Sequence, residues 1–190
     1  ERVGHVGLVE HDDAGALGQR APAQGLVGDI GRQLGLDLLR RQRLARLAGT
    51  RQAFAAGALG PGIAVSPAAG AVVVAPCDGK VSVAFPTGHA YGLRSASGVE
   101  LLIHVGMDTV ELDGKHFTPL VTAGQKVRRG QTLVEVDWAA VGEAGYQTVT
   151  PVVVSNASSF AGVTGAATGA VSRGDALFEV SAAEAVQPTA

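Results

Sequence analysis

The chain has 190 residues, of which 46% are hydrophobic and 17% charged, and it contains 27 glycines. This composition is typical of one compact domain with many turns plus additional sequence. The net charge of −2, without a basic stripe interleaved with aromatic residues, argues against nucleic acid as a partner. The single cysteine, Cys77, excludes an intrachain disulfide and fits a reducing compartment.

The sequence has no uncharged apolar run of about 18 residues, the length that a membrane-spanning helix requires. It also lacks the apolar core of a signal peptide at its start. We therefore expect a cytoplasmic domain with no direct membrane span, to which a membrane protein could be fused outside this sequence.

Residues 1–52 differ in character from the rest of the chain. They are rich in Arg, Gly, Ala, Leu and Gln, and near-helical spacing among arginines is seen for Leu36, Leu39, Leu44 and Leu47. One basic amphipathic helix at a membrane surface or a partner is one interpretation. The many glycines favour a weakly ordered leader or linker. We expect a leader over 1–52, the main domain over 53–186 and a tail over 187–190.

From Phe54 onward, short runs of Val, Ile, Leu and Ala are broken by Gly, Pro and Asp about every 8–12 residues. This pattern predicts an all-β domain, an antiparallel sandwich or barrel with little helix. The expected strands are Gly62–Val65, Ala71–Ala75, Gly79–Ala84, Ala90–Arg94, Val99–His104, Thr109–Leu112, Thr118–Leu120, Thr132–Val136, Thr148–Val154, Gly169–Val171 and Ala176–Val180.

A weak internal repeat supports this fold. The form Val-x-x-Gly-x-x-Leu-x-Glu-Val occurs within 124–136 and again within 168–180. Each copy predicts a turn followed by a strand, with Gly adopting the positive φ that branched residues resist. We expect two similar structural units packed together.

Two histidines flank a predicted β-hairpin. A symmetric loop of two or four residues centred between Ala96 and Ser97 would place His89 directly opposite His104. Opposed side chains lie on one face with Cβ atoms about 4.5–5.5 Å apart, so both imidazoles could contact one small group. A one-residue bulge would abolish this pairing.

Three interpretations of the histidine pair are open. Each histidine could be an ordinary hydrogen-bonded structural residue. The pair could bind zinc with His116 or Asp108 as a third ligand, although no HxH or HExxH spacing is present. Alternatively, a neutral imidazole nitrogen could attack phosphorus, with the other histidine, the Thr87 hydroxyl and backbone amides near Gly106 donating hydrogen bonds to the phosphoryl oxygens.

The segment from Gly98 to Val110, Gly-Val-Glu-Leu-Leu-Ile-His-Val-Gly-Met-Asp-Thr-Val, resembles the active-site signature of the glucose-type enzyme IIA domain of the bacterial phosphotransferase system. The resemblance extends over about Phe54 to Val180. It implies an all-β domain of the duplicated hybrid motif type, a phosphocarrier that uses no cofactor and no metal. Agreement is also seen in the segments 54–65, 75–81, 87–90, 111–114, 124–127 and 148–156.

The resemblance also implies roles for individual residues. His104 would accept the phosphoryl group at Nε2 from phospho-HPr and pass it to a cysteine of a partner IIB domain, accompanied by a membrane IIC domain. His89 would be the auxiliary histidine, oriented by Thr87. The Gly106 carbonyl would fix the His104 tautomer, and Asp108 would lie at the rim of the site.

His104 must be neutral to attack, so we expect a carbonyl rather than a carboxylate as its close partner. A shallow site with an apolar rim would admit a partner and exclude water from the phosphohistidine. Val105, Met107 and Val110 are the candidates for this rim. Each could equally be an ordinary core residue.

Two other protein classes share parts of this pattern. A biotinyl or lipoyl carrier would carry a modified lysine at a hairpin tip, whereas Lys80 is predicted at the start of a strand. A lysostaphin-like zinc peptidase would need a His-x-His pair, which the sequence lacks.

Overall fold

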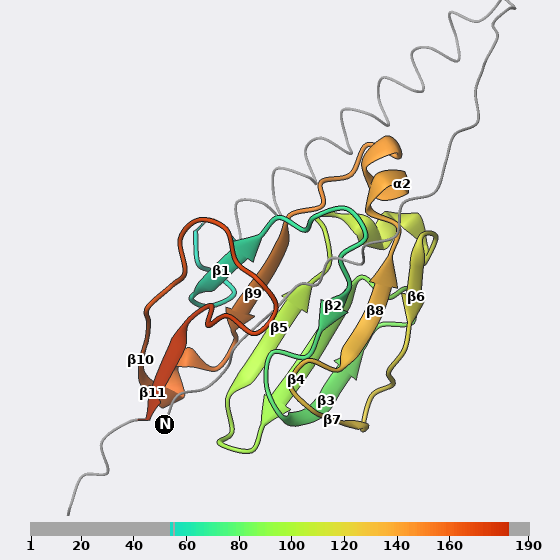
Figure 1. Cartoon of the computed structure of the whole chain (residues 1–190). Helices are drawn as coiled ribbons and strands as arrows, with labels where there is room; N and C mark the ends of the chain where they lie inside the picture. The colour runs from blue at the N-terminus through green and yellow to red at the C-terminus, as the bar shows by residue number, and fades with distance from the viewer. Residues whose placement is uncertain (1–53, 55, 183–190) are drawn as a thin grey trace, which may run out of the picture.

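The structure is a computed structural model that describes residue 54 and residues 56–182 (Figure 1). The expected leader over 1–52, including its possible basic helix, and the expected tail over 187–190 lie outside the described residues. Antiparallel strands dominate the described part, which is the all-β class that the sequence predicts. None of its helices is long and apolar enough to cross a membrane.

The strands form three antiparallel sheets. The largest has the order β1-β9-β5-β4-β3-β7, the second β2-β8-β6, and the third pairs β10 with β11 (Figure 1). The strand bounds are β1 Gly62–Val65, β2 Val73–Val74, β3 Gly79–Ala84, β4 Ala90–Ser95, β5 Glu100–His104, β6 Phe117–Pro119, β7 Lys126–Val127, β8 Thr132–Val136, β9 Thr150–Val154, β10 Phe160–Thr164 and β11 Glu179–Ala182.

Two predicted strands are wrong. Residues Thr109–Leu112 form a 3₁₀ helix, η1, because Asp108 before it and Asp113 after it have φ of 60° and 50°, which no extended chain adopts. Residues Gly169–Val171 lie in irregular chain, and the strand expected over Ala176–Val180 begins only at Glu179.

Four elements of the described residues were not predicted from the sequence: β7, β10, the 3₁₀ helix η2 (Ala157–Ser159) and the helix α2 (Trp138–Glu143). Helix α2 begins after Asp137, whose side chain accepts a hydrogen bond from the Ala140 amide. This side-chain cap satisfies one of the amides that the first helical turn leaves unpaired.

Alternation along β4 and β5 determines which side chains enter the core. Tyr91 on β4 and Ile103 on β5 are a directly opposed pair, and both are buried. The neighbouring positions point to the opposite face, where Arg94 and Glu100 form an ion pair of 3.4 Å. His104 belongs to this second, more exposed set, so the strand pattern places its ring on the outer face of the sheet.

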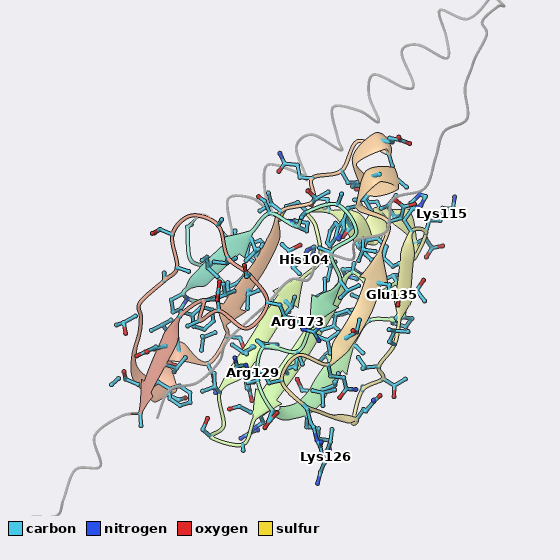
Figure 2. The ribbon with its side chains drawn as sticks, in the orientation of Figure 1. His104, Lys115, Lys126, Arg129, Glu135 and Arg173 are labelled. Carbon is cyan, nitrogen blue, oxygen red and sulfur yellow. The ribbon has the colours of Figure 1, made fainter. Side chains whose placement is uncertain are left out.

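The two copies of the internal repeat meet at their turns. Arg129 Nη2 donates to the Gly174 carbonyl oxygen at 3.0 Å, and Arg173 Nη2 donates to the Gly130 carbonyl oxygen at 2.6 Å. Figure 2 shows both arginine side chains in this part of the molecule. The reciprocal contacts agree with the predicted packing of two units, although the strand of the second copy begins only at Glu179.

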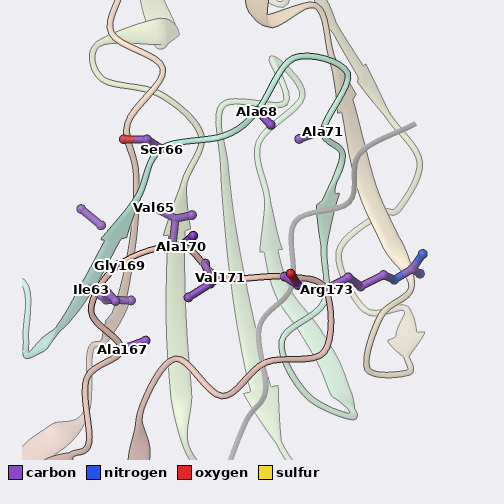
Figure 3. Close-up of a pocket in the computed structure, with 12 residues that line it drawn as sticks. Ile63, Val65, Ser66, Ala68, Ala71, Ala167, Gly169, Ala170, Val171 and Arg173 are labelled. Atoms are coloured by element: carbon purple, nitrogen blue, oxygen red, sulfur yellow. The ribbon is translucent and has the colours of Figure 1, made fainter. Parts of the chain in front are cut away.

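A cavity of about 700 Å³ lies between β1 and the loop over 167–173 (Figure 3). Small and apolar side chains, among them Val65, Ala71 and Val171, form much of its wall. Neither His89 nor His104 lines it. This cavity is therefore separate from the candidate chemistry.

The Trp138 side chain joins α2 to the chain that leads into β2. Its Nε1–H donates to the carbonyl oxygen of Ala71 at 2.6 Å, and both residues are buried. We expect Trp138→Phe to lower the free energy of unfolding by about 1–3 kcal/mol, because a buried carbonyl loses its donor. Urea unfolding followed by circular dichroism would measure this loss, and an unchanged midpoint would contradict it.

Candidate active site

The hairpin that carries the two histidines has a different register from the predicted one. Ala90, not His89, lies opposite His104, so the predicted direct pairing of the histidines is wrong by one residue. The loop holds three residues rather than two or four, because the Ser95 amide donates to the Val99 carbonyl oxygen. Gly98, with φ of 85°, supplies the left-handed residue that such a three-residue loop requires.

The two imidazole rings nevertheless meet, with centroids 5.5 Å apart and planes inclined by 64°. His89 lies just before β4 begins, after Gly88 with φ of 70°, so the alternation of the strand no longer fixes the direction of its side chain. The chain stays paired here, since the Val105 amide donates to the His89 carbonyl oxygen at 2.7 Å. The site therefore forms where β4 begins and β5 ends, and Figure 2 shows His104 at this place.

A hydrogen bond fixes the tautomer of His104. Its Nδ1 lies 2.6 Å from the carbonyl oxygen of Gly106. A carbonyl only accepts, so Nδ1 carries the proton and the neutral ring keeps its lone pair on Nε2. This arrangement leaves the lone pair of Nε2 without a partner from the Gly106 contact.

His89 is held through its own Nδ1 atom, which lies 2.5 Å from Oγ1 of Thr87. If the hydroxyl donates, His89 accepts at Nδ1 and carries its proton on Nε2. The ring would then offer an N–H donor toward a group bound at His104. The two histidines would thus present complementary atoms, a lone pair and a proton.

Both imidazoles are neutral near pH 7. Burial, and to a smaller extent the neighbouring His104, lower the pKa of His89 to about 4. Burial also lowers the pKa of His104, while the hydrogen bond to Gly106 and the charge of Asp108 act in the opposite direction. Burial dominates at both residues because an imidazolium loses its hydration there.

Asp108 is buried, with 6% of its surface exposed. Its Oδ2 atom has no hydrogen-bond partner among the described residues. Its influence on His104 is electrostatic, and the close partner of His104 is a carbonyl, in line with the expectation from the sequence.

The predicted apolar rim is partly wrong. Val105 and Met107 are buried and do not present their side chains to a partner, and Val105 continues the buried alternate set of Leu101 and Ile103. Val110 is 50% exposed, as a rim residue must be.

Two aromatic residues that were not predicted from the sequence lie beside the histidines. Phe54 packs edge-on against His104 with ring centroids 5.7 Å apart, and Phe85 lies 4.9 Å from the ring of His89. Phe85 is 44% exposed, which is high for so large an apolar side chain. Phe85 follows the predicted strand Gly79–Ala84 and precedes His89 by four residues, and this position could have indicated that it lies near the site.

The zinc interpretation has no third ligand in the described part of the chain. No group of three or more His, Cys, Asp or Glu side chains there is arranged to hold a metal ion. Cys77 is also a poor nucleophile, since burial raises its pKa to about 11.

Comparison with known proteins agrees with this geometry. The sequence model of the family described as phosphoenolpyruvate-dependent sugar phosphotransferase system, EIIA 1, matches residues 48–160. The chain belongs to this family. The resemblance found in the sequence is therefore confirmed, and with it the all-β fold of this phosphotransferase component.

Among the similar proteins is the beta-glucoside-specific EIIBCA component of Dickeya chrysanthemi, 49% identical over 118 residues that cover 62% of this chain and 18% of that protein. The mannose-specific EIIBCA component of Corynebacterium glutamicum is 48% identical over 112 residues, 59% of this chain and 16% of that protein. The chain thus spans less than a fifth of the length of either relative.

A solved structure, glucose permease IIA from Mycoplasma capricolum, matches with a TM-score of 0.60 and 35% identity. The match covers 68% of this chain and 81% of that one. The roles of His104, His89, Thr87, Gly106 and Asp108 within the EIIA domain stay predictions.

The lowered pKa of His89 predicts a pH dependence of stability. Between about pH 6.5 and pH 4 the unfolded chain binds a proton at His89 that the folded chain does not bind. The free energy of unfolding therefore falls as the pH falls through this window. We expect His89→Gln to flatten the profile, measured by urea unfolding at successive pH values, and equal slopes for both proteins would contradict the assignment.

Proposed function

We propose that this EIIA domain accepts a phosphoryl group from phospho-HPr on His104 and passes it to a cysteine of an EIIB domain during sugar uptake. The observation that carries the proposal is the hydrogen bond between Nδ1 of His104 and the Gly106 carbonyl, which leaves the Nε2 lone pair available. Membership of the EIIA 1 family supports the donor and the acceptor.

The transfer balances without a cofactor. The Nε2 lone pair of His104 forms a bond to phosphorus while the phosphorus–nitrogen bond of the donor phosphohistidine breaks, and that electron pair returns to the donor ring. As the His104 ring gains positive charge, its Nδ1–H donates more strongly to the Gly106 carbonyl. The same contact therefore stabilises the transition state more than the ground state.

His89 would stabilise the phosphoryl group during its transfer. With Thr87 donating to Nδ1, the Nε2–H of His89 can donate to a phosphoryl oxygen on His104. The low pKa keeps this ring neutral, so it supplies a directed donor rather than a fixed positive charge. A neutral donor allows the phosphoryl group to leave again toward the next acceptor.

The exposed apolar residues around the histidines suit a transient docking surface. Phe85 and Val110 are half exposed, and Phe54 packs against His104 from a third segment of the chain. A partner that covers these side chains would exclude water from the phosphohistidine.

The fused relatives support the proposed partners. They are EIIBCA and EIICBA components, so the EIIB and membrane EIIC domains belong to the same polypeptide in those proteins. For this chain we propose an EIIB acceptor, an accompanying EIIC domain and a cytoplasmic site of action.

The carrier alternative based on a modified lysine does not fit the fold. Lys80 lies inside β3, opposite Arg94 on one side and Lys126 on the other, and not at a hairpin tip.

Phosphorylation with phosphoenolpyruvate, enzyme I and HPr tests the proposal. We expect label on the protein that is stable in alkali and labile in acid, and we expect His104→Gln to abolish it. Label that survives this substitution would contradict the assignment of His104 as the phosphorylated residue.

His89→Gln separates acceptance from delivery. We expect it to accept phosphate from phospho-HPr but to transfer it to EIIB at least about tenfold more slowly, because the departing group loses a donor. His116→Gln is the matched control, because His116 is a third histidine to which the site assigns no role. An unimpaired transfer rate in His89→Gln would remove the auxiliary role.

A further inference from the structure

The peptide group between Val105 and Gly106 is held by threonine hydroxyls at both of its polar atoms. Thr109 Oγ1 donates to the Val105 carbonyl oxygen at 2.6 Å, and the Gly106 amide donates to Thr150 Oγ1 at 3.2 Å. Thr109 begins η1 and Thr150 begins β9, so the two hydroxyls come from separate segments. Neither residue has a role in the sequence analysis.

The direction of each hydrogen bond is fixed by the chemistry of its partners. A threonine hydroxyl has one proton, and Thr150 directs it at the Thr148 carbonyl oxygen at 2.9 Å. Toward Gly106, Thr150 can therefore only accept, which suits an amide donor. Thr109 faces a carbonyl and can only donate. Both side chains are at least 99% buried, so water does not compete for these bonds.

The next peptide group carries the carbonyl that binds His104. Its amide, that of Met107, donates to the Gln147 carbonyl oxygen at 2.8 Å. Gly106 lies between the two fixed peptides with φ of 73°, and a Cβ there would come within 2.6 Å of Thr109 Cγ2. The peptide groups before and after Gly106 are thereby both fixed, and they hold the Gly106 carbonyl toward Nδ1 of His104.

We propose that Thr109 and Thr150 are positioning residues for phosphoryl transfer, holding the Gly106 carbonyl where it selects the Nδ1–H tautomer of His104. The inference rests on the proposed function of His104. A ring that carries its proton on Nε2 has no lone pair on that atom to offer phosphorus, and a ring that rotates away from this carbonyl is no longer held in the Nδ1–H form. Loss of either hydroxyl therefore reduces the fraction of reactive His104.

Thr150→Val tests this inference, since valine keeps the shape of threonine and removes the hydroxyl. In the full chain labelled with ¹⁵N-histidine, correlation spectra above the pKa of His104 report its tautomer without any partner protein. We expect the Nδ1–H form in the unsubstituted chain and a mixture in Thr150→Val. The rate of phosphorylation by phospho-HPr should fall about tenfold, the effect of one lost buried hydrogen bond near a developing charge.

Thr150→Ser and Thr109→Ser keep the hydroxyls and should restore the tautomer and a rate within about twofold of the unsubstituted chain. Val81→Ala, a buried change in β3, controls for general loss of stability and should leave the tautomer unchanged. The inference is overturned if Thr150→Val and Thr109→Val keep the Nδ1–H form, or if Val81→Ala shifts the tautomer equally. Failure of His104 to accept phosphate would leave the tautomer result standing, so the two failures are distinguishable.

Discussion

One hydrogen bond, from Nδ1 of His104 to the carbonyl oxygen of Gly106, decides which atom of the site is free for chemistry. A histidine at a strand end can protonate on either nitrogen, and only one tautomer offers its lone pair on Nε2. The fold provides the acceptor by a turn at Gly106, which needs the positive φ of glycine. The paired ends of β4 and β5 then bring His89 to the same ring.

Burial makes this arrangement effective. It lowers the pKa of both imidazoles, so the rings stay neutral although a carboxylate, Asp108, lies nearby. A neutral nucleophile beside a neutral donor can receive a phosphoryl group and release it again. In the fused EIIBCA relatives the EIIA domain and the EIIB domain share one chain.

The sequence predicted well those features that depend on local alternation and motif. It placed His104 at the end of a strand, the hairpin before it and the second histidine beside it. It failed on the register of the hairpin. Whether the loop holds two, three or four residues depends on the backbone conformation at Gly98, which residue identity alone leaves open. It failed on Val105 and Met107, which are both buried; Val105 continues the buried alternation of Leu101 and Ile103. Phe54 was overlooked because it approaches His104 from a distant segment.

The central claim is that the phosphoryl group is carried on Nε2 of His104. Correlation of ³¹P with the ring atoms of the phosphorylated, ¹⁵N-labelled chain identifies the phosphorylated nitrogen directly. We predict coupling to Nε2 of His104 and a proton retained on Nδ1. A phosphoryl group found on Nδ1, or on any other residue, would contradict the account.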